Sequence, residues 1–179
     1  MSKVIVLGGC GAVGSVAVKT LAAQEVFSEI VIADINRQRA ESIISSAASK
    51  TISFTQLDAE HPESIRQAIA GSDLVVNCIG PFYKTVKTIL EQVIAQKINY
   101  VDVCDDVDVT LEILNWHEKA KKAGITALIG MGSSPGPPIF WRNLPRTICW
   151  MRPGPLISSM LTGASRLKGK ALSATAFIA

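Results

Sequence analysis

The chain has 179 residues and a net charge of +3; 48% of its residues are hydrophobic and 18% are charged, which excludes wholesale disorder and predicts a substantial core. Four cysteines and two histidines are scattered without a C-x-x-C pair, so we expect neither a disulfide scaffold nor a bound metal. The amino-terminal segment lacks the features of a signal peptide, and glycines and prolines between Gly130 and Pro138 interrupt the longest uncharged stretch. We therefore expect a cytoplasmic protein without a membrane span.

Charge divides the chain into two regions. Residues 1–136 contain 12 Lys and Arg against 15 Asp and Glu, whereas residues 137–179 contain six basic residues and no acidic one. Five of the eight prolines also lie in the second region. We predict a folded domain over residues 1–136 and a basic, proline-rich tail over residues 137–179.

Apolar segments of strand length alternate with helical stretches through the first 130 residues. The expected strands are Lys3–Leu7, Glu29–Asp34, Ile52–Leu57, Asp73–Cys78, Tyr100–Cys104 and Ile125–Ile129. The expected helices are Ala12–Ala23, Arg37–Ser49, Pro62–Ala70, Thr85–Gln96 and Val109–Ala123. This alternation predicts an α/β fold: a doubly wound parallel sheet of the Rossmann type, with strand order 3-2-1-4-5-6 and helices on both faces.

A glycine-rich motif joins the first expected strand to the first expected helix. The segment from Gly9 to Gly14 reads G-C-G-A-V-G and matches G-x-G-x-x-G. Gly9 would allow a tight turn, Gly11 a close approach of a pyrophosphate, and Gly14 close packing of helix on strand. The helix N-terminus, with Ala12 and Val13, would then face the phosphates. Glycine-rich turns also occur for packing alone, so the motif by itself is weak.

Asp34 strengthens the dinucleotide interpretation. It ends the second strand, twenty residues after Gly14, where a carboxylate accepts hydrogen bonds from the hydroxyls of the adenosine ribose. The same carboxylate would repel a 2′-phosphate, which favours NAD, but a nearby Arg37 could pair with that phosphate or stack on adenine, so NADP is possible. The alternative is that Asp34 caps the helix that begins near Arg37.

Two further strand ends supply candidate cofactor contacts. Asp58 follows the third strand and could reach the adenine edge, or could cap the helix at Pro62. Cys78, Ile79 and Gly80 lie at the end of the fourth strand, at the point where the strand order reverses, where the backbone should pass the nicotinamide ribose. An ordinary strand-to-helix turn would use the same residues.

Substrate contacts are harder to assign. Tyr83 could project into the cleft or serve packing. Asp105 belongs to an acidic cluster after the fifth strand and is a candidate for the substrate cleft, whereas Asp106 or Asp108 is better explained as a helix cap. No residue can be assigned as a general acid or base.

Four motifs together resemble the saccharopine dehydrogenase family: VLGGCGAVG (6–14), VVNCIGPFY (75–83), YVDVCDD (100–106) and GMGSSPG (130–136), in the family's order. The resemblance covers about residues 1–136. It implies pyridine-nucleotide hydride transfer at a carbon–nitrogen bond of an amino-acid derivative of the lysine or saccharopine type. The implied partners are a dinucleotide and a small amino-acid substrate.

After Gly136 the resemblance stops, although the family would continue with an amphipathic helix and a second, largely β domain for the substrate. Reading the codons one base earlier forces Leu across Phe140/Trp141 and Cys149/Trp150, and permits an amphipathic helix like the family's continuation. We hypothesise that the sequence from about residue 137 is a frameshift product. The chain would then lack the substrate domain and be inactive alone.

The sequence is also compatible with two other functions. A non-catalytic nucleotide-binding module could use its basic tail to contact a polyanion, although we do not expect nucleic acid as the partner. A complete small reductase could form its pocket with an oligomer partner. A truncated sheet would also expose an edge and apolar surface, which makes a homo-oligomer possible.

Overall fold

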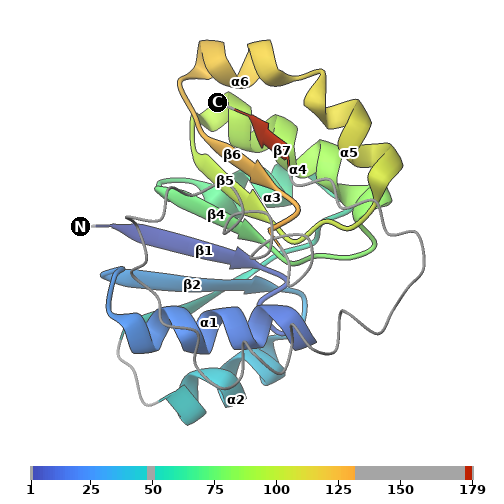
Figure 1. Ribbon diagram of the computed structural model, residues 1–179. Coiled ribbons are helices and arrows are strands. Elements are labelled where there is room, and N and C mark those ends of the chain that lie inside the picture. Colours follow the sequence, from blue (N-terminus) through green and yellow to red (C-terminus); the bar gives the residue numbers. More distant parts are fainter. Residues whose placement is uncertain (1, 48–50, 132–175, 179) are drawn as a thin grey trace, which may run out of the picture.

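The computed structural model describes residues 2–47 and 51–131, together with the backbone of residues 176–178. Its strands form one sheet in the order β3-β2-β1-β4-β5-β6-β7 (Figure 1). The first six pair in parallel, which confirms the predicted doubly wound order. The strands are β1 (Lys3–Leu7), β2 (Glu29–Asp34), β3 (Ile52–Gln56), β4 (Leu74–Asn77), β5 (Asn99–Asp102), β6 (Ala127–Ile129) and β7 (Ala176–Ile178).

Helices cover both faces of the sheet, because successive strand side chains point to opposite faces and both sets are apolar. On β1, Val4 and Val6 pack with α1 and α2, whereas Ile5 and Leu7 pack with the helices of the other face. The helices are α1 (Ala12–Gln24), α2 (Arg37–Ala47), α3 (Pro62–Ile69), α4 (Phe82–Gln96), α5 (Val107–Leu114) and α6 (His117–Ala123).

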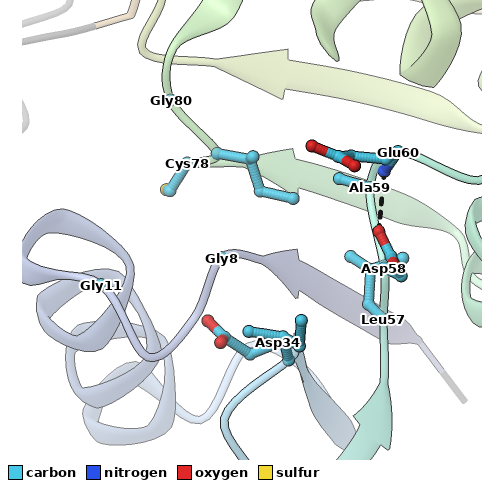
Figure 2. A pocket seen from close by; sticks show the side chains of 11 residues that line it. Gly8, Gly11, Asp34, Leu57, Asp58, Ala59, Glu60, Cys78 and Gly80 are labelled. Atoms are coloured by element: carbon cyan, nitrogen blue, oxygen red, sulfur yellow. Dashed lines mark hydrogen bonds between the residues drawn. The ribbon is translucent and has the colours of Figure 1, made fainter.

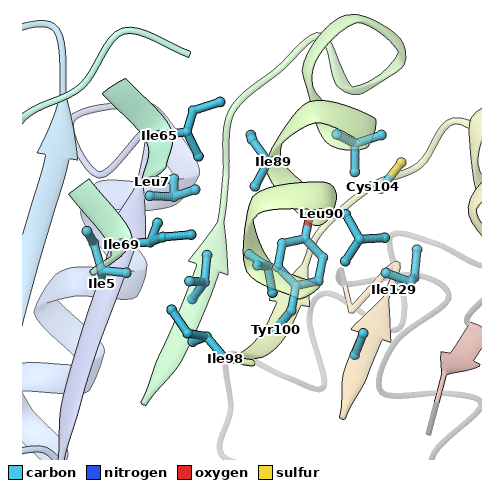
Figure 3. Packing of buried hydrophobic residues seen from close by; sticks show 14 of the residues in the cluster. Ile5, Leu7, Ile65, Ile69, Ile89, Leu90, Ile98, Tyr100, Cys104 and Ile129 are labelled. Atoms are coloured by element: carbon cyan, nitrogen blue, oxygen red, sulfur yellow. The ribbon is translucent and has the colours of Figure 1, made fainter. Parts of the chain in front are cut away.

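The larger core cluster lies between the sheet and α3 to α6. Figure 3 shows Ile65 and Ile69 facing Ile5 and Leu7, and Tyr100 lying among aliphatic side chains close to Leu90. Each fully buried aliphatic side chain of this kind contributes roughly 1.5–3 kcal/mol to folding. This core holds the carboxyl ends of the central strands in fixed relative positions, and the loops that follow them form the site described below.

The helix expected over Val109–Ala123 is two helices, so that prediction was wrong. The amides of Asn115 and Trp116 bond to carbonyls three residues back, and the Asn115 side-chain amide donates to the Leu111 carbonyl at 3.3 Å. An asparagine that bonds to nearby backbone groups competes with continuation of the helix. The chain therefore turns at Asn115 and restarts as α6, which ends as expected at Gly124, with φ +71°.

The edge of β6 is not open. Its residues pair antiparallel with β7, in a register that places Leu128 opposite Phe177. The sequence predicted an exposed sheet edge without naming a strand; β7 covers β6, so the prediction now concerns the outermost strands β3 and β7. The rest of the predicted tail, the frameshift hypothesis that rests on it, and most of the motif at residues 130–136 lie outside the described residues. No helix in residues 2–47 or 51–131 is long and apolar enough to cross a membrane.

Candidate functional site

A cleft of about 500 Å³ lies at the carboxyl ends of four neighbouring strands (Figure 2). Its walls come from the segments that follow β3, β2, β1 and β4. The lining residues are Gly8, Gly11, Asp34, Ile35, Leu57, Asp58, Ala59, Glu60, Cys78, Ile79 and Gly80. Ligands of doubly wound sheets bind at this edge, where the strand order reverses. The volume lies within the roughly 300–1,000 Å³ that is usual for small-molecule sites.

The tight turn after β1 is made by Gly8, not by Gly9 as expected. Gly8 has φ +71°, and a Cβ there would lie 2.9 Å from Ile79 Cγ1 and 3.1 Å from the Cys78 carbonyl oxygen. A side chain would therefore be strained and would also push the loop after β4 away. Gly9 instead allows close packing, because a Cβ would lie 3.0 Å from Ile32 Cγ2.

Gly11 and Gly14 shape the start of α1. A Cβ on Gly14 would lie 2.2 Å from the Gly8 carbonyl oxygen, so the helix can approach the turn only with glycine there. Gly11 is the N-cap residue and offers no side-chain cap, and a Cβ on it would meet only the Gly8 oxygen, at 3.2 Å. The amide of Ser15 makes the bond to the Gly11 carbonyl, so the amides of Ala12 and Val13 precede this first helical bond. Such an uncapped N-terminus suits an anion.

Asp34 lies between the glycine-rich turn and the cleft. Its Oδ2 accepts the Cys10 amide at 2.9 Å and its Oδ1 accepts the Asn36 amide at 3.0 Å. The cap of α2 is Asn36, whose Oδ1 accepts the Arg39 amide at 3.0 Å. Asp34 is therefore not the helix cap considered above. A carboxylate has about four acceptor sites, so Asp34 can accept further bonds from a ligand in the cleft.

Arg37 of α2, for which the sequence predicted a contact with adenine or a 2′-phosphate, lies away from the cleft lining. The Arg37 guanidinium lies 5.1 Å from the centre of the Phe54 ring, and Arg37 does not line the cleft. Burial raises the pKa of the Cys10 thiol to about 11, with Asp34 acting in the same direction, while the charge of Arg39 lowers it. Arg39 itself is exposed and does not line the cleft.

Acidic groups line the far end of the cleft. Asp58 Oδ1 accepts the Glu60 amide at 2.9 Å (Figure 2). Asp58 Oδ2 lies 3.6 Å from His61 Nε2. The N-cap residue of α3 is His61, so Asp58 is not the cap before Pro62. Glu60 also lines the cleft. With Asp34, three carboxylates and no Lys or Arg line the cleft in the described part of the chain.

The loop after β4 forms the opposite wall, with Cys78, Ile79 and Gly80 as expected from the sequence. The Ile79 amide donates to Asn77 Oδ1 at 3.0 Å, and the Cys78 amide donates to the Leu7 carbonyl at 2.9 Å. These bonds tie the wall to β4 and β1. Burial, with the nearby Asp102 carboxylate acting in the same direction, raises the pKa of the Cys78 thiol to about 11.

Neither substrate candidate lines this cleft. Tyr83 is 61% exposed in the first turn of α4, and its amide donates to Asp106 Oδ2 at 3.1 Å. Asp105 is exposed in the loop after β5. Asp106 is the N-cap residue of α5, as expected, but its carboxylate makes no cap bond to α5 and instead accepts the Tyr83 amide in the first turn of α4. Among the described residues, no group of His, Cys, Asp and Glu side chains is arranged to hold a metal ion.

Sequence reasoning missed five lining residues: Gly8, Ile35, Leu57, Ala59 and Glu60. Each directly precedes or follows a predicted residue, or lies in the short loop after β3. Ile35 is 68% exposed although it is large and apolar, and it follows Asp34 at the mouth of the cleft. Its position after the second strand was the available signal.

Alkylation of Cys78 provides a direct test of where a ligand sits. With a pKa of about 11, Cys78 should react slowly with iodoacetamide at pH 8, and the rate should rise about tenfold per pH unit up to that pKa. NADH should slow this reaction, because Cys78 lines the cleft. Mass spectrometry of the Cys78 peptide measures both effects, with the buried Cys104 as internal control. A Cys78 rate unaffected by saturating nucleotide would place the ligand elsewhere.

Comparisons with known proteins agree with this geometry. The model of the family described as "Saccharopine dehydrogenase NADP binding domain" matches residues 4–128. Carboxyaminopropylagmatine dehydrogenase of Synechocystis sp. is 28% identical over 144 residues, which cover 76% of this chain and 35% of that protein. Apo saccharopine dehydrogenase (L-Glu forming) of Saccharomyces cerevisiae has a similar fold, with a TM-score of 0.66 and 22% identity over 79% of this chain and 30% of that one. Pen from Bacillus thuringiensis has a TM-score of 0.50 and 17% identity over 56% of this chain and 36% of that one. The chain thus spans about a third of the length of these relatives.

Proposed function

Since the chain belongs to the saccharopine dehydrogenase NADP-binding-domain family, we propose that its cleft binds a nicotinamide dinucleotide for an oxidoreductase that acts on a carbon–nitrogen bond of an amino-acid derivative. The observation that carries the proposal is the arrangement at the carboxyl edge of the sheet. There, an uncapped helix N-terminus, a glycine-only turn and the Asp34 carboxylate border one cleft.

The residues present fit such a cofactor. Gly11 lines the cleft, where a longer side chain would obstruct a pyrophosphate, and the amides of Ala12 and Val13 are available to the pyrophosphate oxygens. Asp34 would accept the ribose hydroxyls, and the exposed Ile35 side chain would pack on adenine. The bound cofactor supplies hydride transfer. This chain's residues bind and orient it, with the Cys78–Gly80 wall on the side of the nicotinamide ribose.

We propose NAD rather than NADP as the preferred cofactor, although the family description names NADP. Asp34, Asp58 and Glu60 line the cleft, and no described basic side chain lines it with them. An additional 2′-phosphate would meet like charges there, and like-charge contacts disfavour binding. Arg37, which could have compensated, lies over Phe54 instead.

The substrate class follows from the relatives rather than from the cleft. One relative is named as a carboxyaminopropylagmatine dehydrogenase and another as a saccharopine dehydrogenase, and both are about three times as long as the part that matches. We infer that the substrate is an amine or imine of an amino-acid derivative, held by residues outside those described. Neither Tyr83 nor Asp105 lines the cleft. We therefore expect dinucleotide binding without turnover by residues 1–131.

Titration of the purified chain with NADH, followed by nicotinamide fluorescence, tests the proposal. Saturable binding to one site should appear within the ~1 μM to 1 mM range that is usual for cofactors and substrates. Gly11→Val should abolish it, because the branched side chain would occupy the path of the pyrophosphate. Asp73→Asn, at the opposite edge of the sheet where Asp73 accepts the Lys3 amide, should bind like the wild type. Equal binding by both variants, or no binding by the wild type, would contradict the proposal.

A further inference from the structure

Three buried polar side chains form a continuous hydrogen-bonded array next to the cleft. Asn77 ends β4, and Tyr100 and Asp102 lie on β5; each is at most 1% exposed. Asn77 Nδ2 donates to Tyr100 Oη at 2.9 Å, and Tyr100 Oη donates to Asp102 Oδ2 at 2.9 Å. Figure 3 shows the Tyr100 ring amid apolar side chains. Because all three side chains are buried, the array is shielded from water.

The direction of these bonds is fixed. Burial, together with the neighbouring Asp102 carboxylate, raises the pKa of Tyr100 well above its ordinary value, so the phenol keeps its proton. A phenol donates once, and its proton goes to Asp102, so it must accept the Asn77 amide. The amide oxygen of Asn77 is thereby turned away from Tyr100. The orientation of Asn77 is set by its neighbour on β5.

One end of the array holds a wall of the cleft. Asn77 Oδ1 accepts the Ile79 amide at 3.0 Å, and Ile79 lines the cleft between Cys78 and Gly80. Ile79 also lies against Gly8, where a Cβ would approach its Cγ1 to 2.9 Å. A shift of Ile79 would therefore change both the wall after β4 and the glycine-rich turn.

The other end holds the carboxyl end of β6. Asp102 Oδ1 accepts the amides of Gly130 and Cys104 at 2.8 and 3.1 Å, and the Met131 amide donates to the Asp102 carbonyl at 2.7 Å. Burial raises the pKa of the Asp102 carboxyl, and the bonds from Gly130, Cys104 and Tyr100 act against that effect. Three donors to one carboxylate offset much of the cost of burying it. The bonds at both ends go to loop amides rather than to strand amides.

We propose that Tyr100, through Asn77 and Asp102, is a positioning residue that holds the Cys78–Gly80 wall in the conformation that binds the dinucleotide and ties that wall to the segment leaving β6; this rests on the proposed dinucleotide function. Folding alone does not require such an array, because buried polar groups replaced by apolar ones of similar shape often leave stability unchanged. The array instead links two loops that flank the dinucleotide-binding edge.

Tyr100→Phe tests this proposal by removing one hydroxyl from the middle of the array. We expect its NADH affinity to fall about tenfold, because Asn77 and Asp102 lose a buried hydrogen-bond partner and Asn77 no longer holds the wall in place. The comparison is made at temperatures where circular dichroism shows full folding. Amide exchange at Ile79 should become faster. Tyr83→Phe is the matched control, because it removes the hydroxyl of the chain's other tyrosine, which is exposed. Its NADH affinity should stay within about twofold of the wild type.

The outcomes separate the two proposals. If the wild type binds NADH and folded Tyr100→Phe binds equally well, the array is structural only and the positioning role is wrong. If the wild type does not bind, the proposed function fails first and this inference falls with it. A wild-type measurement is independent of how the variant folds: NADH should slow amide exchange at Gly130 and Met131, although neither lines the cleft. Unchanged exchange there would contradict the link to β6.

Discussion

Gly14→Ala should destabilise the domain by about 2–3 kcal/mol and abolish saturable NADH binding. An added Cβ would lie 2.2 Å from the Gly8 carbonyl oxygen and 2.8 Å from the Gly9 Cα. Both are backbone atoms, so no side-chain rotation relieves the overlap, and α1 must move away from the turn. In an unconstrained helix interior the same change would stabilise by about 1 kcal/mol. Urea denaturation and NADH titration measure the two effects.

Gly80→Ala is the matched control for this prediction. A Cβ at Gly80 would have no atom within 4 Å, and the residue does not have a positive φ. Its free energy of unfolding should stay within about 0.5 kcal/mol of the wild type. If Gly14→Ala proves as stable as Gly80→Ala, α1 does not pack on the Gly8 turn as described.

The sheet was predictable because its strands are continuous apolar segments bounded by polar or glycine residues. Lys3–Leu7 and Glu29–Asp34 have the bounds that the sequence indicated. The break between α5 and α6 was not predictable from periodicity, because it depends on an Asn115 side chain that bonds to Leu111. The role of Gly8 was missed because the motif G-x-G-x-x-G begins at Gly9. Only the folded turn shows that Gly8 is the residue with the positive φ.

The sequence predicted the site residues whose place follows from their position at the end of a strand. It did not predict the contacts that depend on how neighbouring strands align. The spacing from the glycine-rich turn placed Asp34 at the cleft. Arg37 contacts Phe54, however, because β3 pairs with β2 in a register that places Phe54 opposite Ile32. The buried array likewise depends on the register that sets Asn77 opposite Asp102. Such cross-strand pairs follow from tertiary structure and leave no local signal.

Asp34→Ser should reduce the preference for NAD over NADP by about tenfold or more, chiefly through weaker NAD binding. A carboxylate that hydrogen-bonds ribose hydroxyls discriminates strongly, and its removal also relieves repulsion of a 2′-phosphate. The change additionally removes acceptors for the Cys10 and Asn36 amides, which should cost about 1–2 kcal/mol of stability. The ratio of the two dissociation constants, measured by titration with NADH and NADPH, cancels that shared loss. Asp73→Ser, which removes a carboxylate from the opposite edge of the sheet, controls for net charge.

A wild-type preference for NADPH would contradict the proposed preference for NAD, and variants of Arg39 would test its cause. If the wild type prefers NADPH, a basic side chain outside the cleft lining must compensate for the three carboxylates, and Arg39, whose charge lowers the pKa of the Cys10 thiol, is the side chain to test. Arg39→Gln would then weaken NADPH binding and leave NADH binding nearly unchanged. The Arg37 guanidinium lies over Phe54, so Arg37→Gln would alter neither dissociation constant. If the wild type prefers NADH, Arg39→Gln should change the ratio of the two dissociation constants little, because Asp34 would then be the group that disfavours the 2′-phosphate. Comparison of the two variants would thus separate a charge effect of Arg39 on the cofactor from the packing of Arg37 on Phe54.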